Sequence, residues 1–153
     1  ERDIIERVNQ IRKRTEYKNY SGETVEFHPS GVITFPLLGT KAKPEDKLAF
    51  DPDRKKRRLI YQLVIAFFPE YNVFIGGSSS FDIVPRPYDK YLGLSRYAEK
   101  HNIRRNAILY VGDDFGPGGN DEPILRAGIR CLNIVDYQEL PSVLEMHLAT
   151  PLP

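Results

Sequence analysis

Apolar residues recur at helical spacing in two stretches of the first half of the chain. Residues 2–15 place Ile4, Ile5, Val8 and Ile11 on one face, and charged residues fill the others. Residues 51–68 form the second pattern. It starts at an Asp-Pro pair that suits a helix N-terminus and stops before a proline. The apolar face predicted for this second helix consists of Leu59, Ile60, Leu63, Val64, Phe67 and Phe68.

Alternating apolar and polar positions predict two pairs of strands. Residues 24–27 and 32–35 form the first pair, and residues 73–75 and 81–84 form the second. A glycine-containing turn joins the strands of each pair, which is typical of a hairpin. The polar residues 41–49 between them predict a loop with no more than about one helical turn. This order predicts an antiparallel sheet covered by helices.

The pattern changes after Pro85-Arg86-Pro87, which marks a boundary. A helix over residues 90–101 is followed by residues 107–112, a run that is apolar on both faces and predicts a buried parallel strand. Further along we expect a helix over 121–127, a strand over 130–135 and a helix over 137–147. Alternating helices and strands of this kind predict half of a doubly wound α/β domain.

The composition excludes several classes of protein. Of the 153 residues, 22 are Lys or Arg and 21 are Asp or Glu, so no bulk positive charge drives nucleic-acid binding. No apolar run is long enough for a membrane span. A single cysteine, Cys131, excludes an internal disulfide and a cysteine-based zinc site, and no secretory leader is visible. We therefore expect a cytoplasmic protein without nucleic-acid or membrane partners.

The densest group of chemistry-bearing residues is the loop 112–121, which directly follows the buried strand. Ligands of open α/β sheets bind at the carboxyl ends of the strands, where this loop lies. Its Asp and Asn side chains offer only oxygen ligands, and these suit Mg²⁺. The alternative is a surface turn rich in Asp and Gly, which composition alone favours. The position after a buried strand favours the site.

One lysine and one run of basic residues allow more than one interpretation. Lys90 opens a predicted helix, where a cation opposes the helix dipole, so it is a candidate for binding phosphate or a carboxylate. The alternative is an ordinary exposed lysine. The run 54–58 contains five cations without interleaved aromatic residues. We expect it to be the solvated start of a helix, and nucleic-acid binding is the less favoured reading.

Two of these segments carry a family resemblance. Asp89-Lys90, then a helix, a buried strand and Gly-Asp-Asp-x5-Asn-Asp, resemble motifs III and IV of the haloacid dehalogenase (HAD) superfamily. Residues 76–90, with Ser-Phe-Asp before the Asp-Lys pair, and Gly-Pro-Gly-Gly-Asn-Asp at 116–121 are similar to eukaryotic-type phosphomannomutases. Enzymes of this superfamily transfer phosphoryl groups through an aspartyl phosphate on Mg²⁺.

The resemblance implies a role for six residues. Lys90 is expected to steady the phosphoryl group and the charge of the nucleophile. Ser80 and Asp82 match positions that contact the sugar hydroxyls of the substrate. The Mg²⁺ site is expected to involve Asp113, Asn120 and Asp121.

The resemblance also implies a domain organisation. Residues 1–86 are expected to form a type IIB α/β cap with an antiparallel sheet, and residues 87–153 the C-terminal half of a Rossmann-like HAD core. Motif I, Asp-x-Asp-x-Thr/Val, which supplies the nucleophile, is absent. Asp51-Pro52-Asp53 has its spacing but starts a helix. We therefore expect the chain alone to be inactive, and expect its open core edge to pair with the missing half or with a second copy.

The expected activity is Mg²⁺-dependent phosphatase action on a small phosphorylated metabolite, with a sugar phosphate favoured. A phosphomannomutase-like sugar phosphomutase is the first alternative. That family grips the distal phosphate with cap arginines, whereas this chain has His28 and Thr40-Lys41 near the matching places. A non-catalytic, stand-alone binding module is the second alternative.

Overall fold

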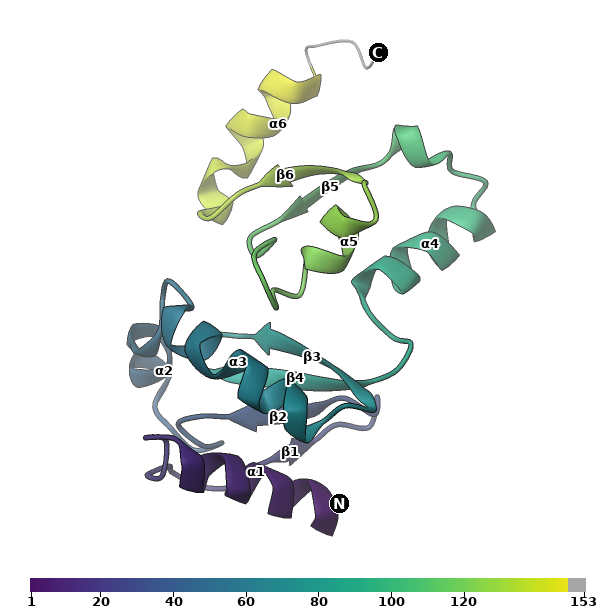
Figure 1. Cartoon of the computed structure of the whole chain (residues 1–153). Coiled ribbons are helices and arrows are strands. Elements are labelled where there is room, and N and C mark those ends of the chain that lie inside the picture. Colours follow the sequence, from purple (N-terminus) through teal and green to yellow (C-terminus); the bar gives the residue numbers. More distant parts are fainter. Residues whose placement is uncertain (149–153) are drawn as a thin grey trace.

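Two separate β-sheets organise the chain in the computed structural model, which describes residues 1–148 (Figure 1). The first sheet is antiparallel with the order β1-β2-β4-β3, and the second is the parallel pair β5-β6. The strands are β1 (Glu26–Phe27), β2 (Ile33–Pro36), β3 (Tyr71–Gly76), β4 (Ser80–Pro85), β5 (Leu109–Gly112) and β6 (Arg130–Asn133). The helices are α1 (Arg2–Arg14), α2 (Pro44–Phe50), α3 (Lys55–Phe67), α4 (Lys90–Lys100), α5 (Glu122–Arg126) and α6 (Leu140–Leu148), with short 3₁₀ turns η1 (Arg105–Ala107) and η2 (Tyr137–Glu139).

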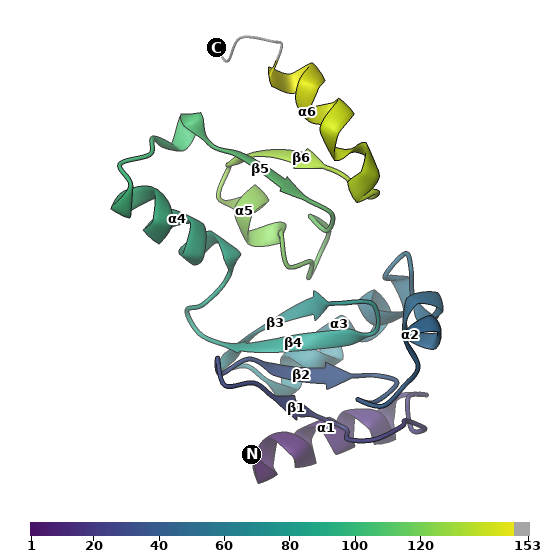
Figure 2. The same cartoon turned by 180° about the vertical axis from the view of Figure 1, so that it is seen from behind.

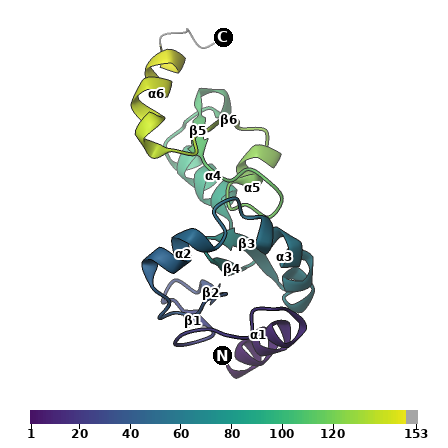
Figure 3. The ribbon, with the colours of Figure 1, turned by 90° about the vertical axis from the view of Figure 1, so that its left-hand side faces the viewer.

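Helices α1 and α3 cover the same face of the antiparallel sheet, as the side view in Figure 3 shows. Alternate residues of each strand point toward these helices and are removed from solvent. Burial of each such side chain contributes about 1.5–3 kcal/mol to the free energy of folding. The fully buried core side chains are Val8, Ile11, Phe35, Leu37, Val64, Phe68, Phe81 and Ile83.

The opposite face of this sheet, turned toward the viewer in Figure 2, presents the other set of alternating residues. Thr34 of β2 is in register with Asp82 of β4, and Asp82 is in register with Phe74 of β3. These three residues therefore form a row across the sheet. The polar side chains of Thr34 and Asp82 in this row lie on the uncovered face, where they can contact a ligand.

A buried arginine ties α1 to the first hairpin. Arg12 is 3% exposed, and its guanidinium donates to Oγ1 of Thr24 and to the carbonyl oxygens of Tyr17, Pro36 and Leu37. Burial lowers the pKa of Arg12 to about 10. Carbonyl and hydroxyl oxygens thus satisfy this cation, and they fix the hairpin against α1.

Three details of the first half differ from the prediction. Residues 44–50 form the helix α2, with Pro44 in its first turn, where a loop was expected. Helix α3 begins at Lys55, not at Asp51, whose carboxylate instead accepts the amides of Lys56 and Arg57 from the preceding turn. Leu59, predicted on the apolar face of α3, is 84% exposed.

The second half follows the predicted order. Strands β5 and β6 pair in parallel, and α5 lies between them in sequence. Strand β5 is only half-buried, because within residues 1–148 β6 is its one neighbouring strand. The predicted α/β fold class, an antiparallel sheet followed by a parallel α/β unit, is confirmed. None of the helices formed by residues 1–148 has the length and apolar character that crossing a bilayer requires.

Candidate functional site

The carboxylate of Asp121 is the centre of a network at the end of β5. Asp121 is 1% exposed, and its Oδ2 accepts the backbone amides of Asp113 at 3.0 Å and of Asp114 at 3.2 Å. Its Oδ1 accepts the Lys90 ammonium at 2.6 Å and the Tyr110 hydroxyl at 2.7 Å. A Cβ at Gly112 would collide with Oδ2, so glycine is required where β5 ends.

Asp121 is held in its ionised form. Burial opposes its charge, but the hydrogen bonds from Lys90, from Tyr110 and from the Asp114 amide outweigh this, and its pKa lies below its ordinary value. Burial, together with the hydrogen bond to Asp121, raises the pKa of Tyr110. Tyr110 therefore acts as a neutral donor to a carboxylate. The sequence offered no signal for this role, because Tyr110 lies inside an apolar run.

Lys90 is positioned by the start of α4. The Asp89 carboxylate accepts the amide of Leu92 at 2.7 Å and caps the helix, so that Lys90 is its first residue. The Lys90 ammonium also donates to Oδ1 of Asn120 at 3.0 Å. An ammonium group has three N–H donors, so these two contacts leave one for a ligand. The Lys90 side chain is 42% exposed, which keeps that donor accessible.

A cleft of about 270 Å³ joins the two halves of the site. Asp82 lines it from the open face of the antiparallel sheet, while Lys90 and Asn120 line it from the other side. The remaining lining residues are largely apolar: Val32, Phe74, Val84, Tyr88 and Asp89. Three of the residues singled out from the sequence thus surround one cleft although they come from three separate segments.

The hairpin β1-β2 supports Asp82. Oγ1 of Thr34 donates to Oδ1 of Asp82 at 3.1 Å, and Nε2 of His28 lies 3.0 Å from the same Oγ1. Burial raises the pKa of Asp82 despite that hydrogen bond and the nearby cations. The sequence reasoning missed Thr34, although the alternation of β2 places it on the face of Asp82.

Ser80 does not line this cleft in the structure. Its hydroxyl donates to the carbonyl oxygen of Gly76 at 3.0 Å within the β3-β4 turn. The guanidinium of Arg57 donates to the carbonyl oxygens of Gly76, Gly77 and Ser80, so this turn is rigidly held.

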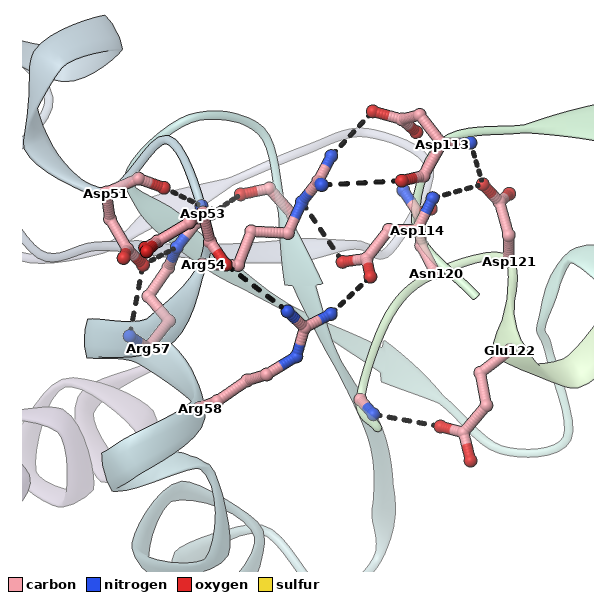
Figure 4. Close-up of polar contacts among 12 residues, drawn as sticks. Asp51, Asp53, Arg54, Arg57, Arg58, Asp113, Asp114, Asn120, Asp121 and Glu122 are labelled. Carbon is pink, nitrogen blue, oxygen red and sulfur yellow. Dashed lines mark hydrogen bonds and ion pairs between the residues drawn. The ribbon is translucent and has the colours of Figure 1, made fainter. Parts of the chain in front are cut away.

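The basic run at the start of α3 is solvated only at Lys55 and Lys56, whereas its three arginines are paired with carboxylates (Figure 4). Arg57 is 1% exposed and forms a buried ion pair with Asp51 at 2.8 Å. Arg54 contacts Asp113 at 2.6 Å, and Arg58 contacts Asp114. Asp113 and Asp114 lie more than fifty positions from these two arginines in sequence, which is why local patterns did not reveal the contacts.

The carboxylates of the loop do not fit a metal site as they are arranged. Asp121 is directed to Lys90, and Asp113 is directed to Arg54. Within residues 1–148, no group of three His, Cys, Asp or Glu side chains is placed to hold a metal ion. Of the expected ligands, Asn120 and Asp121 both accept the Lys90 ammonium, whereas Asp113 is directed to Arg54. The chain's own cations neutralise the charge that a metal would otherwise balance.

Asp51 and Asp53 do not resemble a nucleophile site. Asp51 is buried against Arg57, and the exposed Asp53 pairs with Lys55 at 2.7 Å. Neither follows a parallel strand. This agrees with the sequence-based rejection of Asp51-Pro52-Asp53 as motif I.

Comparison with known proteins covers most of the chain. Residues 6–134 match the family described as eukaryotic phosphomannomutase. The phosphomannomutase of Spinacia oleracea is 33% identical over 111 residues, which are 69% of this chain and 42% of that protein. The phosphomannomutase of Saccharomyces cerevisiae is 32% identical over 108 residues, 67% of this chain and 41% of that protein. The chain thus spans about two fifths of the length of these relatives.

Solved structures add a likeness of fold. An N-terminally truncated, IMP-bound IMP-nucleotidase of Plasmodium falciparum matches with a TM-score of 0.54 and 18% identity, over 97% of this chain and 39% of that chain. An IMP-bound mutant of the same enzyme matches with a TM-score of 0.59 and 20% identity, over 97% of this chain and 37% of that chain. The sequence match decides the family: this chain belongs to the eukaryotic phosphomannomutase family of the HAD superfamily.

Proposed function

We propose that this chain forms the substrate-binding cap and part of the core of a phosphoryl-transfer enzyme that acts on a small phosphorylated metabolite. The observation that carries this is the position of Lys90. Its ammonium is fixed by Asn120 and Asp121, retains a free donor, and faces a cleft whose other wall carries Asp82. A fixed ammonium binds a phosphoryl oxygen as a compact point charge.

Each residue has a distinct role in this proposal. Lys90 binds the phosphoryl group, and Asn120 with Asp121 holds the ammonium in place. Asp82 accepts hydrogen bonds from hydroxyl groups of the substrate and is supported by Thr34, while Ser80 lies two residues before it on the same strand. Residues 1–86 then correspond to the cap and residues 87–153 to the C-terminal half of the core. The nucleophile would come from outside these residues, so the chain alone is expected to be inactive.

Between phosphatase and mutase activity, the cap favours the phosphatase. A mutase must also bind a second phosphate, and His28 near the matching place of a cap arginine contacts Thr34. The names of the curated relatives favour the mutase. A sugar phosphate is the favoured substrate, since Asp82 can accept hydrogen bonds from vicinal hydroxyl groups.

Mg²⁺, which phosphotransferases of this superfamily generally use, would have to displace Arg54 from Asp113. When bound it would supply charge neutralisation for the phosphoryl group. We assign it no step, because the carboxylates as arranged do not form its site. A cytoplasmic location also stays a prediction.

Association through the second sheet is part of the proposal. An apolar cavity of about 300 Å³ lies along β5, lined by Val111, Ile134, Val135, Tyr137 and Leu140 with Gly112 and Asp113. Val135 and Tyr137 are 82% and 80% exposed. An open strand edge beside such a surface favours pairing with the rest of a core or with a second copy. A concentration-independent monomer in size-exclusion chromatography would contradict the self-association.

The test uses the protein expressed from its complete reading frame. Release of phosphate from mannose 6-phosphate identifies the phosphatase, and interconversion of mannose 1-phosphate and mannose 6-phosphate identifies the mutase. Lys90→Met and Asp121→Ala should each abolish turnover, while Lys55→Met, which removes an exposed cation of α3, should not. Binding without turnover would support the stand-alone binding module. Turnover that survives both site substitutions would overturn the proposal.

A further inference from the structure

Two arginines at the start of α3 reach across to the loop that follows β5. Arg58 donates to Oδ1 of Asp114, and its Nε donates to the carbonyl oxygen of Pro117 at 3.4 Å. Arg54 donates to Oδ2 of Asp113 at 2.6 Å and to the carbonyl oxygen of the same residue at 3.3 Å. We call these four side chains, Arg54, Arg58, Asp113 and Asp114, the clasp (Figure 4).

The buried carboxylate of Asp114 depends on the two arginines of the clasp. Its side chain is 5% exposed, and Oδ2 lies 3.1 Å from Nε of Arg54 without a hydrogen bond. The contact of that oxygen is therefore ionic only. A carboxylate buried to this degree is costly without its cations, because it has lost its hydration. Removing an arginine therefore favours an arrangement in which Asp114 returns to water.

Neutral contacts continue the clasp along the edge of the antiparallel sheet. The amide of Ile75 in β3 donates to the carbonyl oxygen of Gly118 at 2.7 Å, so the loop extends the sheet by one bridge. The ring of Tyr61 in α3 lies where a Cβ at Gly118 would be. Helix α3 and strand β3 thus contact the loop in three ways: through the ion pairs of the clasp, through the hydrogen bond from Ile75 to Gly118, and through the Tyr61 ring beside Gly118.

We propose that Arg54 and Arg58 are positioning residues that hold β3 and β4 over the loop, so that Asp82 stays opposite Lys90 and Asn120 across the cleft. This rests on the proposed function for the use of the cleft. The clasp itself requires no ligand. It connects the cleft wall that carries Asp82 to the wall that carries Lys90 through ion pairs between residues that do not themselves line the cleft.

The experiment is amide hydrogen exchange on the chain, with Arg58→Met as the variant. Methionine keeps the apolar stem of Arg58 and removes its charge. We expect the Ile75 amide to exchange at least about 10-fold faster, since its acceptor lies on the far side of the clasp. The amide of Leu37, which donates to Ser79 inside the hairpin region, should keep its rate. Lys55→Met removes the same charge from the same helix and should change neither amide.

A second readout tests positioning as opposed to simple stability. In the full-length enzyme, Arg58→Met should raise KM for the sugar phosphate by about 10-fold and leave kcat within about 2-fold, because the cap wall binds and does not react. Arg58→Lys restores a cation and should recover part of both effects. An unchanged Ile75 rate, or an equal change in Lys55→Met, would overturn the clasp.

The outcomes separate the clasp from the proposed function. If Arg58→Met also exposes Leu37, Asp114→Asn repeats the test from the loop, with the shape of the side chain preserved. Faster exchange at Ile75 alone in that variant supports the clasp, and no change overturns it. Selective exchange at Ile75 in a protein without any turnover would refute the proposed function and leave the clasp intact.

Discussion

The ammonium group of Lys90 lies 2.6 Å from Oδ1 of Asp121, a carboxylate that is 1% exposed. The two residues are 31 positions apart in sequence, and the starts of α4 and α5 bring them together. Because two backbone amides also donate hydrogen bonds to the Asp121 carboxylate, this carboxylate is held in place and fixes the position of the Lys90 ammonium. A lysine held in this way has little freedom left to lose when it binds a phosphate.

Removing the Lys90 charge should destabilise the fold measurably. Lys90→Met leaves the buried Asp121 with hydrogen bonds but without its counter-ion, and Lys90 is partly exposed. We expect a loss of about 1–2 kcal/mol in the free energy of unfolding, below the range for fully buried pairs. Urea denaturation measures it. Lys100→Met, at the exposed end of the same helix, is the control and should change the value by less than about 0.5 kcal/mol.

The contribution of Asp121 should disappear in acid. Its pKa is depressed below the ordinary value of 3.8, so the unfolded chain binds the proton more readily than the folded chain. The stabilisation is therefore complete above pH 3.8 and is lost as the pH falls through the depressed pKa of Asp121 in the folded chain. The difference in unfolding free energy between the wild type and Asp121→Asn should shrink as the pH falls from about 6 toward about 2.5. A difference that stays constant over this range would contradict the assignment.

Asp82 should show the opposite sign. Burial raises its pKa, so its ionised form costs stability at neutral pH. Asp82→Asn keeps an oxygen for the Thr34 hydroxyl, and should stabilise the chain above the raised folded pKa while weakening substrate binding. Thermal unfolding at pH values of about 7 and about 3 tests this, because the gain should vanish when Asp82 is protonated. A loss of stability at neutral pH would show that the carboxylate is a structural residue.

Two ion pairs within seven residues should differ strongly in strength. Arg57 and Asp51 have side chains that are 1% and 0% exposed, whereas Lys55 and Asp53 are 82% and 53% exposed. Arg57→Met should cost about 3–5 kcal/mol, because it leaves Asp51 buried without its partner and frees the β3-β4 turn. Lys55→Met should cost less than about 1 kcal/mol. Equal effects in chemical denaturation would refute this distinction.

Two glycine substitutions should have opposite signs. Gly118 has φ 77°, and a Cβ there would lie 2.5 Å from the Tyr61 ring, so Gly118→Ala should destabilise the chain by about 1–3 kcal/mol. Gly93 lies inside α4, and a Cβ would have nothing within 4 Å. Gly93→Ala should stabilise by about 0.5–1 kcal/mol. Thermal unfolding of both variants provides the comparison.

Local sequence patterns predicted the parts of this molecule that depend on periodicity. The two hairpins and the parallel pair β5-β6 follow from the alternating and the continuous apolar runs along the chain. Lys90, Asn120 and Asp121, which the structure brings together, were singled out by the family resemblance and not by periodicity. Helix α2 was missed, because its polar sequence buries no residue and so carries no apolar stripe.

The partners of the basic run could not be predicted in the same way. Arg54 and Arg58 are separated from Asp113 and Asp114 by more than fifty residues, and nothing in their spacing indicates contact. Because of the same contacts, the loop carboxylates expected to bind Mg²⁺ are paired with cations of the chain itself. Acidic residues in a loop suit a cation, but the sequence alone does not show that two arginines and Lys90 supply it.

Titration of the ¹⁵N-labelled chain with mannose 6-phosphate, followed by amide chemical shifts, tests the central claim most directly. Binding in the cleft should shift the amides of Lys90 and Asn120 through the phosphate and that of Asp82 through the sugar, and inorganic phosphate should shift only the first two. In Lys90→Met the affinity should fall by at least about 10-fold. If no shifts occur at these three positions, or if the Lys90→Met chain binds as tightly as the wild type, the cleft is not a phosphate site.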